Sequence, residues 1–305
     1  MKIAFMFSGQ GSQYVGMGKD LYDQYDCVRT VFEQANQILG YDISKIIFED
    51  EAKLNDTLYT QTSMFVFYQA ILKVLEEHNV FSDYSLGLSL GEYGAYLHNN
   101  VFDFKTGLKI IEKRGLYMNQ ASTEHPGSMS AIIGMDAKDL LELIDQADGY
   151  VKIANYNTYG QLVISGETQA VKSLSQLALN HGARRAILLN TSGAFHTDFM
   201  MKASERFETL LKEIHLEEPS KHLLINVTGD FYNQNIKKTM VDQITNSVLF
   251  YQMIEKLINE GIDTFIEIGP KTTLCSFVKK INRDLTILNV ENMKSLESTL
   301  LKLEG

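Results

Sequence analysis

Apolar residues along this chain alternate between short continuous runs and stripes with helical spacing, a pattern typical of an α/β fold. The run at 2–7 predicts a buried strand, and the glycine-rich turn after it leads into a helix at 17–25. The stripe at 62–77 predicts a buried helix directly before a short strand at 84–86. The same reasoning predicts strands at 223–227, 264–268 and 286–290, and helices at 92–98, 104–119, 197–214, 241–260 and up to 280.

The segment 128–190 has a pattern of its own, with glycines between its elements. The predicted strands are 129–135, 151–156, 161–165 and 185–189, and the predicted helices are 138–147 and 170–180. The order β-α-β-β-α-β is that of a ferredoxin-like unit. We therefore predict a discontinuous large α/β domain at 1–126 and 192–305, interrupted by a small ferredoxin-like subdomain at 127–191.

Composition narrows the class of protein. The 305 residues, of which 45% are hydrophobic and 22% charged, are enough for one large domain or two modest ones. The net charge of −10 argues against general binding to nucleic acid or to an anionic membrane. Two distant cysteines suggest neither a disulfide framework nor a zinc site. The first residues are too briefly apolar for a signal peptide and no run is long enough to span a membrane, so we expect a cytoplasmic protein.

The most informative motif is Gly-Leu-Ser-Leu-Gly at 87–91, which has the form G-x-S-x-G between a strand and a helix. In such a turn the glycines allow a strained bend that exposes the serine, here Ser89, as a nucleophile. The pentapeptide alone is also compatible with a serine that has a structural role in a turn and no catalytic role. The earlier glycine-rich turn at 9–13 could cradle a phosphate, but it lacks both the dinucleotide fingerprint and the P-loop Gly-Lys-Ser/Thr.

A serine nucleophile needs a base, and the chain has seven histidines. His196 is the best candidate by position, because it follows a predicted strand through a turn of small residues. Loops after the strands of an α/β sheet are where catalytic side chains collect.

Six ordered motifs, spread over nearly the whole chain, resemble those of the malonyl-CoA:acyl carrier protein transacylases. They are Phe-Ser-Gly-Gln-Gly-Ser-Gln at 7–13, Gly-Leu-Ser-Leu-Gly-Glu-Tyr at 87–93, Lys-Arg-Gly at 113–115, Ala-Asn-Tyr-Asn at 154–157, Ser-Gly-Ala-Phe-His at 192–196 and Glu-Ile-Gly-Pro at 267–270. The resemblance implies a hydrolase-like α/β domain with a parallel sheet and a ferredoxin-like insertion, which agrees with the order of elements above.

The resemblance assigns roles to individual residues. Ser89 would be the acylated nucleophile and His196 its base. Gln10 and Leu90 would offer backbone N–H groups to the oxyanion of the tetrahedral intermediate. Arg114 would hold the malonyl carboxylate by two parallel charge-assisted bonds, which selects malonyl over acetyl.

Other residues would line the substrate site. Phe195 would restrict room at the malonyl α-carbon, although packing in the core would explain an aromatic residue there equally well. Asn155 and Asn157 would hydrogen-bond the pantetheine or acyl portion, although asparagine is also a common turn former. Met118 on the helix at 104–119 completes this set.

Two positions depart from the family pattern. Leu88 stands where many members have histidine, and Leu249 stands where they have glutamine. In the family the carbonyl at the glutamine position orients the base, and Leu249 still offers a backbone carbonyl.

The resemblance implies that malonyl-CoA and acyl carrier protein are the partners and that no metal or redox cofactor is needed. We also expect a monomer, with Arg184 and Arg185 as a basic docking patch for the acidic carrier. Three alternatives remain open: an acyltransferase or acyl hydrolase that serves a polyketide synthase, an editing thioesterase, and a carrier-binding scaffold without turnover.

Overall fold

The computed structural model describes residues 1–191, 193–233 and 235–304, which pack as two compact units. The first unit contains residues 1–115, 216–224 and 256–305, and the second contains residues 116–215 and 225–255. Helix α7 (Phe104–Glu124) and helix α12 (Phe250–Asn259) each begin in one unit and end in the other. The second unit is larger than the predicted subdomain at 127–191, whose boundaries stay a prediction.

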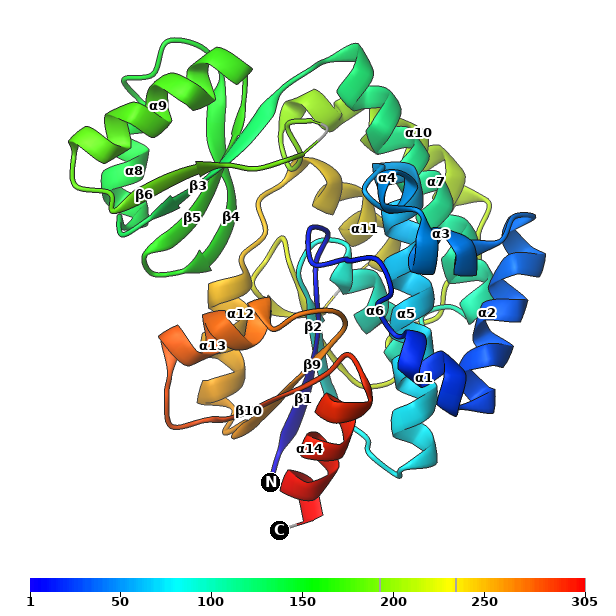
Figure 1. Ribbon diagram of the computed structural model, residues 1–305. Coiled ribbons are helices and arrows are strands. Elements are labelled where there is room, and N and C mark those ends of the chain that lie inside the picture. Colours follow the sequence, from blue (N-terminus) through cyan, green and yellow to red (C-terminus); the bar gives the residue numbers. More distant parts are fainter. Residues whose placement is uncertain (192, 234, 305) are drawn as a thin grey trace. The chain divides into compact units, whose positions relative to one another are not determined.

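A parallel sheet forms the centre of the first unit (Figure 1). The six-stranded sheet has the order β10-β9-β1-β2-β7-β8, where β8 is Asp230–Phe231, and the pairs from β10 to β7 are parallel. The side chains of β1 and β9 are almost entirely buried, as expected of strands covered on both faces. The bounds are β1 (Ile3–Phe7), β2 (Tyr84–Gly87), β7 (His222–Ile225), β9 (Thr264–Ile268) and β10 (Thr286–Val290).

Helices cover this sheet. Helix α5 (Thr57–Glu77) begins earlier than predicted, because the Asp56 carboxylate caps it by accepting the N–H of Leu58 at 2.9 Å. Helix α6 (Gly91–His98) packs on β1 and β2, and α2 packs on α5. The other helices of this unit are α1 (Lys19–Gln24), α2 (Asp26–Leu39), α3 (Ile43–Glu49), α4 (Glu51–Leu54), α13 (Thr273–Ile281) and α14 (Met293–Glu304).

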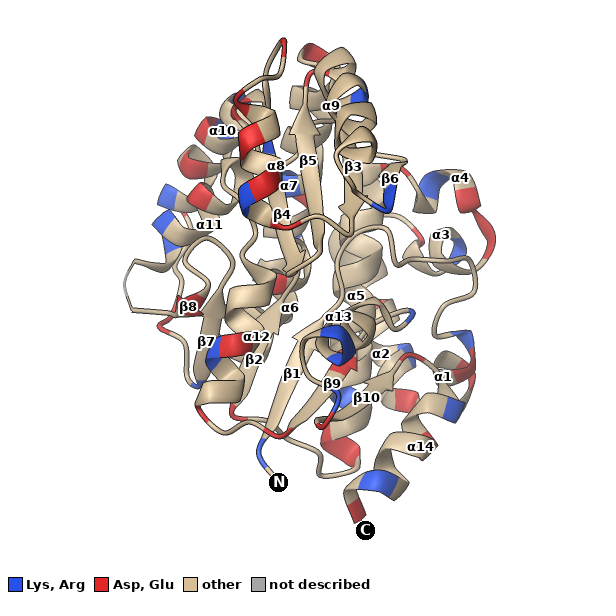
Figure 2. Ribbon diagram, turned by 90° about the vertical axis from the view of Figure 1, so that its left-hand side faces the viewer, with Lys and Arg blue, Asp and Glu red and all other residues tan. Residues whose placement is uncertain are grey.

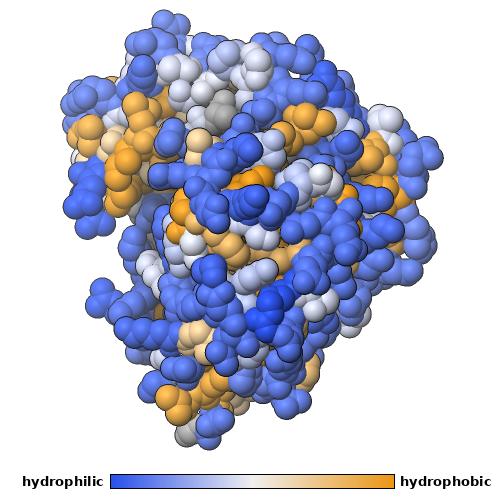
Figure 3. Space-filling model, turned by 45° about the vertical axis from the view of Figure 1, so that its right-hand side comes forward, coloured by the Kyte–Doolittle hydropathy of each residue, from blue (hydrophilic) through white to orange (hydrophobic). Residues whose placement is uncertain are grey.

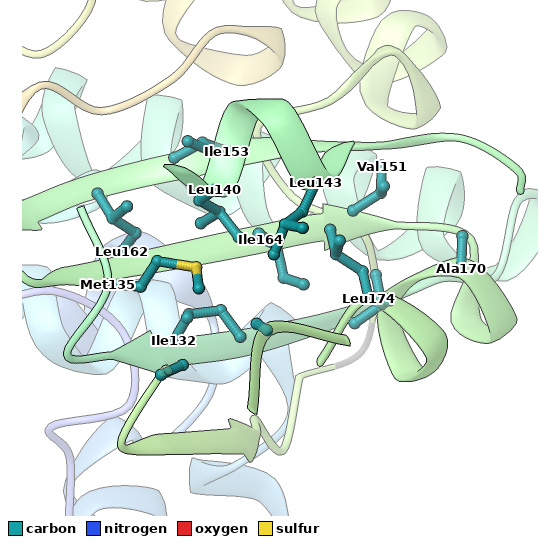
Figure 4. Packing of buried hydrophobic residues seen from close by; sticks show 13 residues of the cluster. Ile132, Met135, Leu140, Leu143, Val151, Ile153, Leu162, Ile164, Ala170 and Leu174 are labelled. Atoms are coloured by element: carbon teal, nitrogen blue, oxygen red, sulfur yellow. The ribbon is translucent and has the colours of Figure 1, made fainter. Parts of the chain in front are cut away.

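The second unit contains the predicted ferredoxin-like element order. Its antiparallel sheet has four strands in the order β4-β5-β3-β6, and a cluster of aliphatic side chains fills the space between this sheet and helices α8 and α9 (Figure 4). The predicted α/β fold with a parallel sheet and a ferredoxin-like insertion is therefore confirmed. The bounds are β3 (Ser128–Ile133), α8 (Ala137–Ile144), β4 (Val151–Thr158), β5 (Gln161–Gly166), α9 (Thr168–Asn180) and β6 (Arg185–Leu188).

The single helix predicted at 241–260 is wrong. The structure has α11 (Ile236–Thr245) and α12, separated by an extended segment at 246–249. Val248 in this segment bonds to β4 in both directions, from its N–H to Ala154 O at 2.8 Å and from Tyr156 N–H to its carbonyl at 2.9 Å. These bonds replace the helical ones and end α11. The remaining elements are a 3₁₀ turn (Asp198–Met200), α10 (Met201–Lys212) and β8 (Asp230–Phe231).

The surface carries both signs of charge. Acidic and basic residues are interspersed along the helices, and basic residues occur on β6 (Figure 2). On the face drawn in Figure 3, apolar residues form separate patches among hydrophilic ones. Within the described residues, no helix has the length and apolar character needed to cross a membrane.

Candidate active site

Ser89 lies in the turn between β2 and α6. Its φ is 53°, in the left-handed region, where a non-glycine residue is destabilised by roughly 1–2 kcal/mol. The turn is held by two backbone bonds, from Leu88 N–H to Phe7 O at 3.1 Å and from Gly91 N–H to Leu88 O at 3.0 Å. The sequence motif therefore forms a strained strand-to-helix turn with a partly exposed serine at its tip.

The two glycines of the motif allow this turn because backbone passes close to both. A Cβ on Gly87 would lie 2.0 Å from the carbonyl carbon of Gly91. A Cβ on Gly91 would lie 2.0 Å from Phe7 O and 2.7 Å from Phe7 C. Neither position can take a side chain unless β1, β2 and α6 separate.

We expect Gly91→Ala to destabilise the protein by about 3 kcal/mol or more, because the clash is with backbone atoms of a central strand. Thermal unfolding monitored by circular dichroism measures the effect. Gly160→Ala is the matched control, since a Cβ there would meet nothing closer than 3.9 Å. Equal melting temperatures for the two variants would contradict this account of the turn.

Leu88, one of the two departures from the family pattern, lies against the loop that follows β1. A Cβ on Gly9 would be 3.1 Å from Leu88 Cδ2 and 2.9 Å from Leu88 O. The leucine side chain thus packs on Gly9, in contact with the loop that carries Gln10.

Gln10 and Leu90 follow the neighbouring strands β1 and β2, whose register pairs Phe7 with Gly87. Because the strands are parallel, the loops after them meet at the same edge of the sheet. Leu90 is buried at the start of α6, and the side-chain amide of Gln10 donates to Thr57 Oγ1 at 3.2 Å. Within the described residues, neither backbone N–H has an acceptor in the protein, so both are available to an oxyanion.

The loop of Gln10 is fixed by buried contacts. The Tyr68 hydroxyl donates to Ser8 O, and the Ser12 hydroxyl donates to Gly9 O at 2.7 Å. Ser8 N–H donates to Ile268 O at 3.2 Å, which ties the loop to β9. The hydroxyl bond explains the serine at position 12, whereas these bonds of Ser8 use only its backbone.

Arg114 brings a cation to the nucleophile. Its side chain is only 1% exposed, yet its Nη2 lies 3.4 Å from Ser89 Oγ. Nη1 donates to Gln61 Oε1 at 2.8 Å, and the guanidinium carbon lies 5.1 Å from the centre of the Tyr93 ring. The guanidinium is thereby oriented with one edge towards Ser89.

Gln61 and Tyr93 position Arg114, and neither was identified from the sequence. Gln61 belongs to a run of fully buried polar residues within the apolar helix α5, at 60–63. A polar run on a buried helix face is the signal that could have indicated it. Burial raises the pKa of the Tyr93 phenol, which therefore stays neutral beside the guanidinium.

The Glu-Ile-Gly-Pro motif has a structural role in the first unit. The buried Glu267 carboxylate accepts the N–H groups of Leu274 at 3.1 Å and Cys275 at 2.8 Å, at the start of α13. Burial raises the pKa of Glu267 to about 7, against the effect of those bonds. This carboxyl group anchors α13 to β9.

His196 belongs to the second unit and is only 3% exposed. Its φ is 61°, so it too has a strained left-handed backbone. Nδ1 lies 2.9 Å from Gln243 O and 3.1 Å from Asn246 O. Since carbonyl oxygens only accept, Nδ1 carries the proton and Nε2 is the basic nitrogen.

The prediction that the Leu249 carbonyl orients the base is wrong. Leu249 O accepts the N–H of Met253 at 3.2 Å, as the first helical bond of α12. The orienting carbonyls are those of Gln243 and Asn246, at the end of α11. They point outward because α11 stops there and leaves its last carbonyls without helical partners.

The substrate-site candidates in the second unit are buried. Met118 is 2% exposed, and Phe195 lies directly beside the base. The backbone of Asn155 pairs with that of Val248 in an isolated β-bridge, so it has a structural role. The buried Oδ1 of Asn157 has no hydrogen-bond partner among the described residues, which leaves it able to accept a bond from a ligand.

Arg184 and Arg185 are both exposed, at the start of β6. Ser192, the first residue of the motif that ends at His196, lies outside the described residues. Within the described part of the chain, no three His, Cys, Asp or Glu side chains are placed to hold a metal ion. The candidates thus form two groups: Ser89, Arg114, Gln10 and Leu90 in the first unit, and the others in the second.

The family model, the related sequences and the related structures all indicate the same family. Residues 4–299 match the model of the acyl transferase domain. The malonyl CoA-acyl carrier protein transacylase of Bacillus subtilis is 38% identical over 97% of this chain and 95% of its own length. The crystal structure of the Clostridium perfringens malonyl CoA-acyl carrier protein transacylase is 41% identical, with a TM-score of 0.96 over 100% of this chain and 98% of that one. A malonyl-transacylase solved in complex with a type II PKS acyl-carrier protein is 31% identical, with a TM-score of 0.96 over 99% of this chain and 100% of that one. This chain therefore belongs to the malonyl-CoA:acyl carrier protein transacylase family, within the acyl transferase domains.

Proposed function

We propose that this chain transfers a malonyl group from malonyl-CoA to the phosphopantetheine thiol of acyl carrier protein, through an ester on Ser89, for fatty-acid biosynthesis. The names of the relatives support this pair of substrates. The observation that carries the proposal is the buried guanidinium of Arg114, 3.4 Å from Ser89 Oγ. A carboxylate held there would place the thioester carbonyl of the same short acyl group beside the hydroxyl.

The proposed reaction has two halves. Ser89 Oγ attacks the thioester carbonyl while His196 Nε2 takes the hydroxyl proton. The C–S bond then breaks, and the proton goes to the departing CoA sulfur. In the second half the carrier's thiol gives its proton to His196 and attacks the ester, the bond to Ser89 Oγ breaks, and His196 returns the proton to Ser89 Oγ.

The other assignments complete this site. The backbone N–H groups of Gln10 and Leu90 stabilise the oxyanion in both halves. Phe195, Met118, Asn155 and Asn157 line the acyl and pantetheine portions. Because each step is a proton transfer or an acyl transfer, the reaction as proposed needs no metal or redox cofactor.

The direct test uses malonyl-CoA with and without holo acyl carrier protein, followed by intact-protein mass. A transferase accumulates a malonyl adduct on the enzyme and passes it to the carrier thiol. Rapid loss of malonate to water without carrier would instead identify a hydrolase of the same fold. Acetyl- and methylmalonyl-CoA in parallel would show which acyl groups the site accepts.

A carrier from polyketide synthesis is the second candidate acceptor, because one related transacylase was solved with a type II PKS acyl-carrier protein. The comparison to make is kcat/KM for a fatty-acid carrier against a polyketide carrier under the same conditions. A higher value for the polyketide carrier would replace fatty-acid biosynthesis in the proposal. Monomeric state and cytoplasmic location stay predictions.

The proposed docking patch consists of Arg184 and Arg185. Neither makes an ion pair with any residue that the structure describes, so both charges are available to an acidic partner. Reversing both charges (R184E/R185E) should raise KM for the carrier about tenfold or more, because like charges then meet across the interface. The formation of the malonyl adduct from malonyl-CoA should not change.

The matched control is K138E/K172E, which makes the same change in net charge at two exposed lysines of α8 and α9. It should leave KM for the carrier within about twofold of wild type, since screened charges outside an interface contribute little. Similar KM values for both double variants would rule out Arg184 and Arg185 as the docking patch.

A further inference from the structure

The first unit contains a cavity of about 290 Å³ at the amino-terminal edge of its sheet. All of its lining residues belong to 1–115 and 216–224, so it lies entirely within this unit. The volume equals about ten water molecules, which suits a small ligand rather than a drug-sized one. No step of the proposed reaction uses it.

The cavity lies at the opposite end of two elements from the nucleophile. β2 runs from Tyr84, near the cavity, to Gly87, which precedes Ser89 by two residues. α6 begins at Gly91, just after Ser89, and ends at His98, which lines the cavity. At about 3.3 Å per strand residue and 1.5 Å per helix residue, each element separates the two sites by more than about 10 Å. The cavity is therefore distinct from the site of Ser89.

Lys221 places an ammonium group in this cavity. Its Nζ donates to Ser82 O at 3.0 Å and lies 3.3 Å from His98 Nε2. Among the described residues, no carboxylate lies within ion-pair distance of this group, and Asp83 and Glu76 act on it only at longer range. Burial lowers the pKa of Lys221, which reflects the cost of keeping this charge partly desolvated.

His98 cannot balance that charge. Burial and the neighbouring Lys221 lower the pKa of His98 to about 4, so its ring is neutral at pH 7. The ring also packs against Phe5, with centroids 5.0 Å apart.

The two carboxylates in the lining already have partners. Glu76 pairs with Lys73 at 2.6 Å. Asp103 accepts the N–H of Thr106 at 2.7 Å at the start of α7, and this bond lowers the pKa of Asp103. The acids are thus engaged, whereas Lys221 keeps donor capacity for an anion.

Four phenylalanines contribute to the rest of the lining. Phe5, Phe102 and Phe104 form buried walls. Phe81 also lines the cavity, yet its side chain is 56% exposed, which is unusual for a phenylalanine and places an apolar group where a ligand could enter. The lining has a second lysine, Lys73, but it pairs with Glu76, so the aromatic walls and the ammonium of Lys221 suit an amphiphilic anion.

We propose that this cavity binds a small monocarboxylate with a short apolar group, with the carboxylate on Lys221 Nζ and the apolar group between the phenyl rings. This site is independent of the proposed transferase activity. The carboxylate supplies the counter-charge that Lys221 lacks, and the rings bury the apolar part.

The test uses 3-phenylpropanoate as the probe and 3-phenylpropanol as its uncharged counterpart, in calorimetric titrations of the full chain. The acid should bind with Kd on the order of 1 mM or tighter, as expected of a ligand of this size, and the alcohol at least tenfold more weakly. On saturation with the acid, the ring proton resonances of His98 should shift. Equal affinity for acid and alcohol, or binding without a change at His98, would overturn the proposal.

Lys221→Met keeps the length of the side chain without its charge, and it should weaken binding of the acid at least tenfold while leaving the alcohol unchanged. Lys221→Arg should still bind the acid. Lys302→Met, at an exposed position in α14, should bind the acid with the Kd of wild type. Undiminished binding of the acid to Lys221→Met would refute the assignment. If Lys221→Met fails to fold, the comparison of acid with alcohol on the wild-type chain and Lys221→Arg still decides.

Discussion

Ser89→Ala should lower the rate of malonyl transfer by at least about 10³-fold, because removal of a nucleophile leaves only binding and oxyanion stabilisation. No malonyl adduct should appear in the intact-protein mass. The fold should be preserved, since a φ of 53° destabilises the folded state by a similar amount with alanine as with serine. Melting temperature and malonyl-CoA binding are therefore the companion measurements.

Ser44→Ala is the matched control, since it removes a hydroxyl from the short helix α3 and should keep full activity. A Ser89→Ala variant that retains transfer would contradict covalent catalysis at this residue. A variant that loses transfer but retains biological activity would instead support a carrier-binding scaffold. A variant that unfolds would show that the Ser89 hydroxyl is needed for the turn itself.

The strands of the parallel sheet could be predicted because they are buried on both faces and appear as short apolar runs. β9 and β10 begin and end where the sequence predicts. Helix α2 is absent from the prediction although Val28, Val31 and Phe32 keep helical spacing, so the signal was present. The break between α11 and α12 could not be read in the same way, because apolar spacing continues through it. It depends on bonds from Val248 to β4, a partner distant in sequence.

The same break explains which part of the site could not be predicted. Short motifs indicate residues whose local backbone matters, such as the turn of Ser89, where Gly91 must pass Phe7 O at close range. The carbonyls that orient His196 are defined only by where α11 ends, so the sequence pointed to Leu249 instead of Gln243 and Asn246. Gln61 was missed because its role arises from contact with Arg114 across two helices.

Arg114→Ala should separate malonyl from acetyl transfer. Loss of a buried charged hydrogen-bonding partner for the carboxylate should lower kcat/KM for malonyl-CoA by roughly 10²- to 10³-fold, corresponding to about 3–4 kcal/mol. Acetyl-CoA has no carboxylate, so its rate should stay the same or rise. The measurement is the ratio of the two kcat/KM values for each variant.

Two variants make the result specific. Arg114→Lys keeps the charge but not the planar fork, and should recover only part of the preference for malonyl. Lys113→Ala, at the neighbouring position, should keep the wild-type ratio. Arg114 is also buried against Gln61 and Tyr93, so its removal could disturb the turn of Ser89. A disturbed turn would lower kcat/KM for both substrates by the same factor and leave their ratio unchanged. Loss of carboxylate recognition would lower kcat/KM for malonyl-CoA alone. The ratio, rather than either rate, therefore distinguishes a residue that binds the substrate from one that supports the nucleophile.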